Sequence, residues 1–179
     1  ICMNDECFQK KIYTVSHFFI EMGTDNISDR TIEMLGVFSI EAAYMLQLED
    51  MEKLPGFGKR KAEIIYGEIR DTLVTKPERL LAAFGMPLIG TTISKSLMSK
   101  FTIEELFEIK DPETLGLGPI TSRSLIDNIG KYKPLYDFLI YEGLEFEKED
   151  LEMKTLKGMK FALTGAGPLK RKEYISMCE

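Results

Sequence analysis

A short glycine-framed turn recurs along the chain at a nearly constant spacing of about thirty residues. It has the form Gly-h-Gly, where h is apolar: Leu-Pro-Gly-Phe-Gly at residues 54–58 and Leu-Gly-Leu-Gly at residues 115–118. The copy at 88–90, Leu-Ile-Gly, lacks the first glycine, and the copy at 26–28, Asn-Ile-Ser, lacks both. The last positions of the four turns are Ser28, Gly58, Gly90 and Gly118, with spacings of 30, 32 and 28 residues. This regularity predicts one structural unit repeated four times.

The segments between the turns have helical periodicity. Apolar residues recur at helical spacing after the second turn (Ala62, Ile65, Ile69) and after the third (Ile93, Leu97, Phe101). The predicted helices that follow the four turns cover residues 29–35, 59–70, 91–100 and 119–129. Capping boxes are predicted at Thr75 with Glu78 and at Thr102 with Glu105, and a helix stop at Gly143. The sequence therefore predicts a mainly α chain of helix, tight turn, helix.

The composition of the turn predicts a phosphate-binding backbone. Glycine permits positive φ and close approach of another molecule. The residue between the glycines (Phe57, Ile89 or Leu117) is expected to point inward and anchor the turn. The N–H groups of the turn and of the next helix start then face outward, where the helix dipole favours an anion. Because such contacts reach only the DNA backbone, they carry no sequence information.

The charge balance requires such a localised device. With 23 basic and 29 acidic residues the net charge is −6, which argues against binding nucleic acid by bulk positive charge. The predicted DNA-binding residues are those that shape the turns or carry a donor in the next helical turn: Gly56, Gly58, Lys59, Arg60, Gly90, Thr91, Thr92, Gly116, Gly118 and Arg123. The alternative is that these are glycine-punctuated helix turns without a ligand.

The order of the motifs resembles the C-terminal half of bacterial-type NAD-dependent DNA ligases. In that family a four-cysteine zinc finger precedes four helix-hairpin-helix motifs and a BRCT domain. Cys2 and Cys7 are similar to the second cysteine pair of the finger. Residues 54–62, 83–92 and 116–123 are similar to the second, third and fourth hairpins. Residues 156–165, Leu-Lys-Gly-Met-Lys-Phe-Ala-Leu-Thr-Gly, are similar to the opening of the BRCT domain. The resemblance covers the entire chain.

The resemblance implies a fold and a division into segments. The fold is mainly α, a tandem helix-hairpin-helix domain of four motifs (SAM/RuvA-domain-2-like) with a partial α/β BRCT tail. The implied segments are the end of a zinc finger with a connecting helix (1–21), the helix-hairpin-helix domain (22–143), an acidic linker (144–155) and a truncated BRCT start (156–179). Two departures concern the hairpins. Leu88 stands where the third would have its first glycine, and the first has Asn26, a residue that tolerates positive φ.

The resemblance also implies a function. The chain would hold nicked duplex DNA for ligation in replication and repair. Its implied partners are that DNA and the adenylation and oligonucleotide-binding regions of the same ligase, in cis or as a second chain. Zinc and NAD are implied for the complete enzyme and no cofactor for this chain. Cys2 and Cys7 supply half of a zinc site, so the chain alone is not expected to hold zinc. No Lys-x-Asp-Gly adenylation motif occurs, so no catalytic residue is predicted, and the chain is expected to be inactive by itself.

Other interpretations remain open at this point. The chain is either a truncated sequence or, as in some phage-type relatives, a split subunit. It could instead be a helix-hairpin-helix module of another repair or recombination protein, or a helical protein-interaction domain with no DNA role. His17 is interpreted as a packing residue, the acidic stretch 145–152 as a solvated linker, and the basic run 170–172 as a solvated helix face. No apolar run reaches the roughly 20 residues of a membrane-spanning helix, so no membrane contact is expected. Three cysteines, two of them five positions apart, do not make a disulfide framework, so a reducing cytoplasm is expected.

Overall fold

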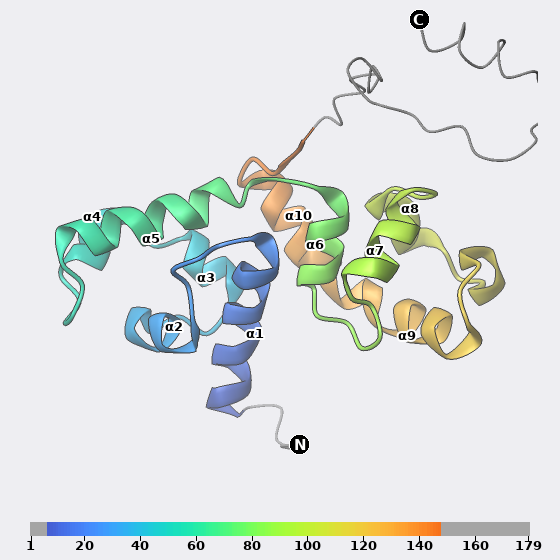
Figure 1. The fold of residues 1–179 in the computed structure, drawn as a ribbon, viewed down its shortest axis with the longest axis horizontal. Helices are drawn as coiled ribbons and strands as arrows, with labels where there is room; N and C mark the ends of the chain where they lie inside the picture. The colour runs from blue at the N-terminus through green and yellow to red at the C-terminus, as the bar shows by residue number, and fades with distance from the viewer. Residues whose placement is uncertain (1–6, 148–179) are drawn as a thin grey trace, which may run out of the picture. The chain divides into compact units, whose positions relative to one another are not determined.

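The computed structural model describes residues 7–147, and this part of the chain is mainly helical, as predicted (Figure 1). In chain order the elements are α1 (Phe8–Met22), α2 (Asp29–Leu35), α3 (Ile40–Tyr44), α4 (Leu48–Glu52), α5 (Lys59–Asp71), β1 (Val74–Thr75), α6 (Pro77–Ala83), α7 (Thr91–Met98), α8 (Ile103–Glu108), η1 (Pro112–Leu115), α9 (Pro119–Ile129), η2 (Gly130–Tyr132), α10 (Lys133–Tyr141) and β2 (Glu145–Phe146). The helices predicted after the four turns are confirmed as α2, α5, α7 and α9. Cys2, the BRCT-like segment and the basic run 170–172 lie outside the described residues.

The first helix is part of the same core as the helices that follow it. α1 contacts both α2 and α6, and Figure 1 shows it lying between them. Its Phe18 and Phe19 are fully buried, and their rings meet edge to face with centroids 5.3 Å apart. The buried apolar residues form one cluster that runs from α1 to Leu144. The boundary expected at residue 22 therefore does not separate two cores, because the apolar face of α1 is covered by the helices after it.

A two-stranded parallel sheet closes this unit at the start of the acidic stretch. β1 pairs with β2, in the register Val74 with Glu145 and Thr75 with Phe146. The N–H of Glu145 donates to the carbonyl of Leu73 at 2.8 Å. Leu144 before it is buried. The first residues of the predicted linker thus belong to the helical unit, since backbone pairing holds them against a segment about seventy residues earlier.

A buried polar network joins α3, α5 and α10. The hydroxyls of Tyr44 and Thr72 share a hydrogen bond of 2.6 Å. Burial raises the pKa of Tyr44 to about 12, so the phenol keeps its proton at neutral pH. Arg70 donates to the carbonyl of Tyr44 and forms an ion pair with Glu142 at 3.2 Å. Both charged side chains are largely buried, so this pair is screened less by solvent than a surface pair.

The predicted helix ends are confirmed in two of three cases. Thr102 and Glu105 form the expected capping box, and Gly143 takes a left-handed conformation just after α10. The capping box predicted at Thr75 is wrong. The N-cap of α6 is Lys76, followed by Pro77 in the first turn, and Thr75 is held in β1 instead. Tertiary pairing with β2 has overridden the local capping signal.

Candidate nucleic-acid interface

The four turns, named here hairpins 1 to 4 (residues 26–28, 56–58, 88–90 and 116–118), all occupy the same place relative to a helix. The last residue of each is the N-cap of the helix that follows, Ser28 of α2, Gly58 of α5, Gly90 of α7 and Gly118 of α9. The fourth residue beyond each N-cap is buried in every copy: Ile32, Ala62, Ser94 and Ser122. The repeat seen in the sequence is thus a repeat in structure.

In hairpins 2, 3 and 4 the left-handed residue is the first one and not the last. Gly56 has φ +80° and Gly116 has φ +64°, whereas Gly58 has φ −93°. The second glycine is an extended N-cap, a conformation open to any residue. The positive φ that glycine permits is therefore used by Gly56 and Gly116 and not by Gly58. A Cβ on Gly58 would meet nothing within 4 Å, while one on Gly56 would lie 2.8 Å from Cε of Met34.

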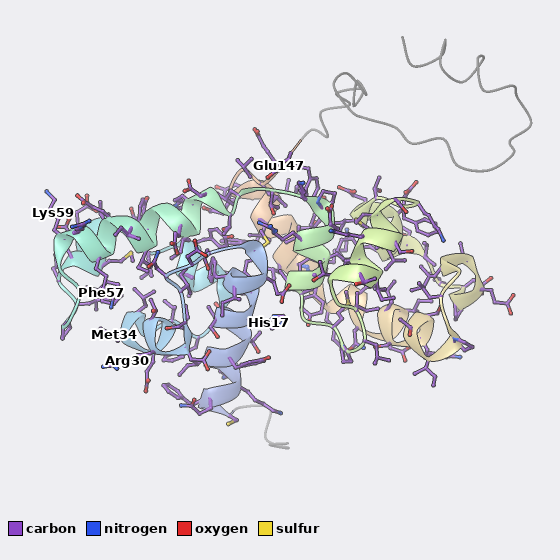
Figure 2. All side chains as sticks on the ribbon, in the orientation of Figure 1. His17, Arg30, Met34, Phe57, Lys59 and Glu147 are labelled. Atoms are coloured by element: carbon purple, nitrogen blue, oxygen red, sulfur yellow. The ribbon has the colours of Figure 1, made fainter. Side chains whose placement is uncertain are left out.

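The middle residue of each hairpin anchors it, as predicted. Phe57 and Ile89 are buried, and Leu117 is half-buried against the core. Nζ of Lys61 lies 4.4 Å from the centroid of the Phe57 ring, so this cation is held beside hairpin 2. Figure 2 shows Phe57 on the side of the turn that faces Met34 of α2, with Lys59 directed outward.

Hairpins 2, 3 and 4 present uncapped helix starts. The first N–H groups of a helix have no partner within it, and a glycine N-cap supplies no side-chain acceptor. Among the helices within residues 7–147, only α5, α7 and α9 have a glycine N-cap, and none of the three has an acidic residue in its first turn. By contrast, α2, α3 and α8 are capped by a serine or threonine and carry acids there. The three starts therefore combine open donors with an undiminished positive helix end.

The predicted side-chain donors surround these starts on the surface. Lys59 and Arg60 are exposed at hairpin 2, Thr91 and Thr92 at hairpin 3, and Arg123 at hairpin 4. Hairpin 4 differs in one respect, because Pro119 follows its N-cap and has no N–H to offer. Its open backbone donors therefore begin one residue later.

Hairpin 1 and the start of α2 already donate hydrogen bonds to groups of the same chain. The hydroxyl of Ser28 accepts from the N–H of Thr31 at 3.3 Å. The N–H of Asn26 donates to the Glu68 carboxylate at 3.0 Å, and its side-chain amide donates to the other carboxylate oxygen. Asn26 is not among the left-handed residues, so the positive φ that its residue type tolerates is not used. The carboxylate of Glu68 on α5 thus accepts the hydrogen bonds that Asn26 could otherwise donate to a bound anion.

This arrangement leads to a prediction for hairpin 1. Asn26→Ala should change duplex affinity by less than about twofold, roughly 0.4 kcal/mol, because its donors already serve Glu68. It should lower the free energy of unfolding by about 0.5–1.5 kcal/mol through the lost side-chain hydrogen bond to Glu68, while the backbone N–H of residue 26 keeps its own bond. Titration of a labelled duplex and urea unfolding measure the two effects. A large loss of affinity with little loss of stability would show that hairpin 1 contacts DNA.

Tertiary contacts join the hairpins in two pairs. The Asn26–Glu68 contact ties hairpin 1 to the helix of hairpin 2. Likewise, the hydroxyl of Ser124 on α9 donates to the carbonyl of Pro87, beside hairpin 3, at 2.6 Å. A hollow of about 620 Å³ lies between hairpins 1 and 2, lined by Asn26, Gly58, Lys59, Arg60, Lys61, Ile64 and Ile65. A second, of about 370 Å³, lies where hairpin 3 meets α1 and α6, lined by residues that include His17, Glu21, Leu88, Gly90 and Thr91.

The fold brings charged residues to hairpins 3 and 4 that the sequence analysis missed. Thr91 shares a hollow of about 300 Å³ with three cations and two carboxylates: Lys76, Arg79, Lys95, Glu21 and Glu78. Nζ of Lys100 lies 3.5 Å from the position of a Cβ on Gly116. Lys95 could have been found, since it lies four residues after Thr91 on the same helical face. The cations of α6 could not, because only tertiary packing sets them beside α7.

The described residues offer little to a metal ion. Within residues 7–147 no group of three or more His, Cys, Asp or Glu side chains could hold one. Cys7 is the half-buried N-cap of α1, and its predicted companion Cys2 lies outside the described range. His17 packs beside Gly85 and the Tyr13 ring, in agreement with a packing role.

None of the helices in this part of the chain has both the length and the apolar character needed to cross a bilayer.

The amino-acid sequence of this chain is similar to those of several curated DNA ligases. No protein-family model matches it. It is 28% identical to the DNA ligase of Thermotoga neapolitana over 192 aligned positions, which cover 99% of this chain and 28% of that protein. The DNA ligase of Nautilia profundicola is 28% identical, with 99% and 29% covered. That of Thermodesulfovibrio yellowstonii is 29% identical, again with 99% and 29% covered. The chain spans less than a third of the length of these curated relatives. The predicted resemblance to DNA ligases is confirmed.

Proposed function

We propose that this chain, which is similar over nearly its whole length to curated DNA ligases, is the part of such an enzyme that holds nicked duplex DNA. Three uncapped, acid-free helix starts behind glycine hairpins carry this proposal. Each supplies backbone N–H groups to a phosphate oxygen, and hydrogen bonds to a charged group contribute about 1.5–3 kcal/mol each. Because no base edge is contacted, the grip is independent of sequence.

The electrostatics of the chain support a backbone-based grip. Its net charge of −6 repels DNA at long range, so attraction has to arise locally. Cationic side chains supplement the N–H donors at each open hairpin. They are Lys59 and Arg60 at hairpin 2, Lys100 and Arg123 at hairpin 4, and the cations beside Thr91 at hairpin 3. Hairpin 1 takes no part in the proposed grip, since Glu68 occupies the donors of Asn26, Ser28 caps the start of α2 and the acidic Asp29 lies in its first turn.

The resemblance supports a more specific assignment within the same proposal. The complete enzyme is the NAD-dependent type, which acts in replication and repair. In it a zinc finger and a BRCT domain flank four helix-hairpin-helix motifs, and the adenylation and oligonucleotide-binding regions act with this chain in cis or as a second chain. Binding of nicked duplex by the chain alone distinguishes this proposal from a helical protein-interaction domain, which would bind none.

A single-charge substitution tests the balance between backbone and side-chain contacts. Lys59→Ala should lower nicked-duplex affinity only a fewfold, because the N–H donors of α5 remain. It should also reduce the slope of log affinity against log salt by about one unit or less, as one phosphate contact is lost. Anisotropy titrations at several salt concentrations measure both quantities.

The matched control for this substitution is Lys53→Ala. Lys53 is an exposed lysine engaged with Asp50 at 2.9 Å and lies outside the hairpins, so neither quantity should change. If Lys59→Ala and Lys53→Ala behave alike, hairpin 2 does not contact phosphate through its first-turn lysine.

A further inference from the structure

Leu88 has a backbone conformation that disfavours its own residue type. It is the only non-glycine residue within 7–147 with positive φ, at +68°. Hairpins 2 and 4 have glycine at this position, where that conformation carries no steric cost. Leu88 also contributes little to folding by burial, since it is 59% exposed and lies outside the core and the residues packed against it. Strained backbone conformations cluster at functional and ligand-binding sites. The strain at this exposed leucine is therefore a reason to consider it a ligand contact.

Each of the three open hairpins has such an exposed aliphatic side chain beside it. Leu88 lines the same hollow as Gly90 and Thr91. Ile64 is 43% exposed and shares the hollow of hairpin 2 with Gly58 and Lys59. Ile120, in the first turn of α9, is 77% exposed. None of the three is among the buried residues of the core or the partly buried residues packed against it, so exposed apolar surface adjoins phosphate-binding groups at all three hairpins.

The chemistry of a nucleic-acid strand identifies what this apolar surface would meet. Every backbone phosphate is flanked by two sugars, so a side chain beside a bound phosphate is within reach of a sugar. In deoxyribose the 2′ carbon is a CH₂ group, which an aliphatic side chain can cover. In ribose the same carbon carries a hydroxyl, and covering it without a hydrogen-bond partner costs free energy. The 2′-hydroxyl is the group by which proteins distinguish RNA from DNA.

We infer that Leu88, Ile64 and Ile120 are sugar contacts that make the hairpin grip select a deoxyribose strand over a ribose strand. The inference rests on the proposed function, because it takes the three hairpins as phosphate-binding. It adds a substrate preference that the backbone N–H groups cannot supply, since phosphates are identical in DNA and RNA. It also gives a reason for a leucine at a position where glycine is unstrained.

The test compares strands that differ only at the 2′ position. Affinities of the full chain are measured by anisotropy for one nicked duplex in three forms, with a DNA strand, a ribose strand or a 2′-fluoro strand opposite a common DNA strand. The 2′-fluoro strand has a ribose-like pucker but no hydroxyl to desolvate, so it separates sugar shape from the hydroxyl. The parent chain should bind the DNA form about five- to tenfold more tightly than the ribose form, with the 2′-fluoro form close to DNA.

Substitutions at the aliphatic side chains should remove this preference. Leu88→Asn and Ile120→Asn together should bring the DNA-to-ribose ratio below about twofold, because an amide can hydrogen-bond the 2′-hydroxyl. Asparagine tolerates the left-handed conformation, so the melting temperature should stay within a few degrees of the parent. Leu88→Gly, which carries no strain at all, serves as the second variant and should also weaken the preference. Met45→Asn removes an apolar side chain that is 67% exposed outside the hairpins and should leave the ratio unchanged.

The outcomes separate the inference from the function on which it rests. A parent chain that binds no duplex overturns the proposed function and the inference with it. A parent that binds all three forms equally, or hairpin variants that keep the parent ratio, overturns the inference alone. Loss of the preference in the hairpin variants with its retention in Met45→Asn supports it.

Discussion

Gly56→Val should lower nicked-duplex affinity by an order of magnitude or more and also destabilise the chain. Gly56 has φ +80°, where a β-branched residue is strained by about 1–3 kcal/mol. Its new side chain would also start 2.8 Å from Cε of Met34. Relieving both conflicts requires hairpin 2 to move, and its N–H groups then no longer converge on a phosphate. The loss of affinity should be similar across unrelated DNA sequences, since no base is read.

Two matched variants separate the hairpin from the strain itself. Gly36→Val carries a comparable φ, +67°, in open space at the C-cap of α2. It should cost similar stability but leave affinity unchanged. Gly58→Val places its side chain on an extended backbone in open space, so it should retain the fold and weaken binding by crowding the phosphate. Circular dichroism and thermal melting accompany the titrations. A folded Gly56→Val chain that binds DNA as well as the parent would remove hairpin 2 from the mechanism.

Phe19→Ala should reduce the free energy of unfolding by about 3–5 kcal/mol, as expected for truncating a buried aromatic ring. Phe19 is fully buried, and its ring lies 5.5 Å from that of Tyr44, centroid to centroid. Truncation leaves a cavity where α1 meets α3, next to the Tyr44–Thr72 hydrogen bond. Denaturant unfolding measures the change in the free energy of unfolding. An unchanged slope of this free energy against denaturant concentration shows that the unfolded state is the same in both proteins.

The control for this prediction lies on the same helix. Tyr13 is 60% exposed, so Tyr13→Ala should cost less than about 1 kcal/mol. If Phe19→Ala proves equally mild, α1 is not part of the cooperative unit, which would favour the boundary expected from the sequence at residue 22.

Local chemistry made much of this chain predictable. A turn ending at Gly58, Gly90 or Gly118 followed by a helical apolar pattern needs only neighbouring residues to form. For that reason the starts of α5, α7 and α9, the inward Phe57 and Ile89, and the capping box at Thr102 could be read from the sequence. The outward placement of Lys59, Arg60 and Arg123 follows from the same helical spacing.

Tertiary structure decided what the hairpins can do. Local sequence marks both glycines of a hairpin as flexible, but only packing decides that Gly56 is left-handed and Gly58 extended. A carboxylate 42 residues away occupies the donors of Asn26, and no spacing rule indicates that Glu68 would reach them. Pairing with β2 took Thr75 out of its predicted cap, and packing of α6 on α7 put cations beside Thr91. The physical reason is the same in each case: the turn's backbone is set by contacts within a few residues, whereas its open or filled donors depend on residues that only the folded chain brings near.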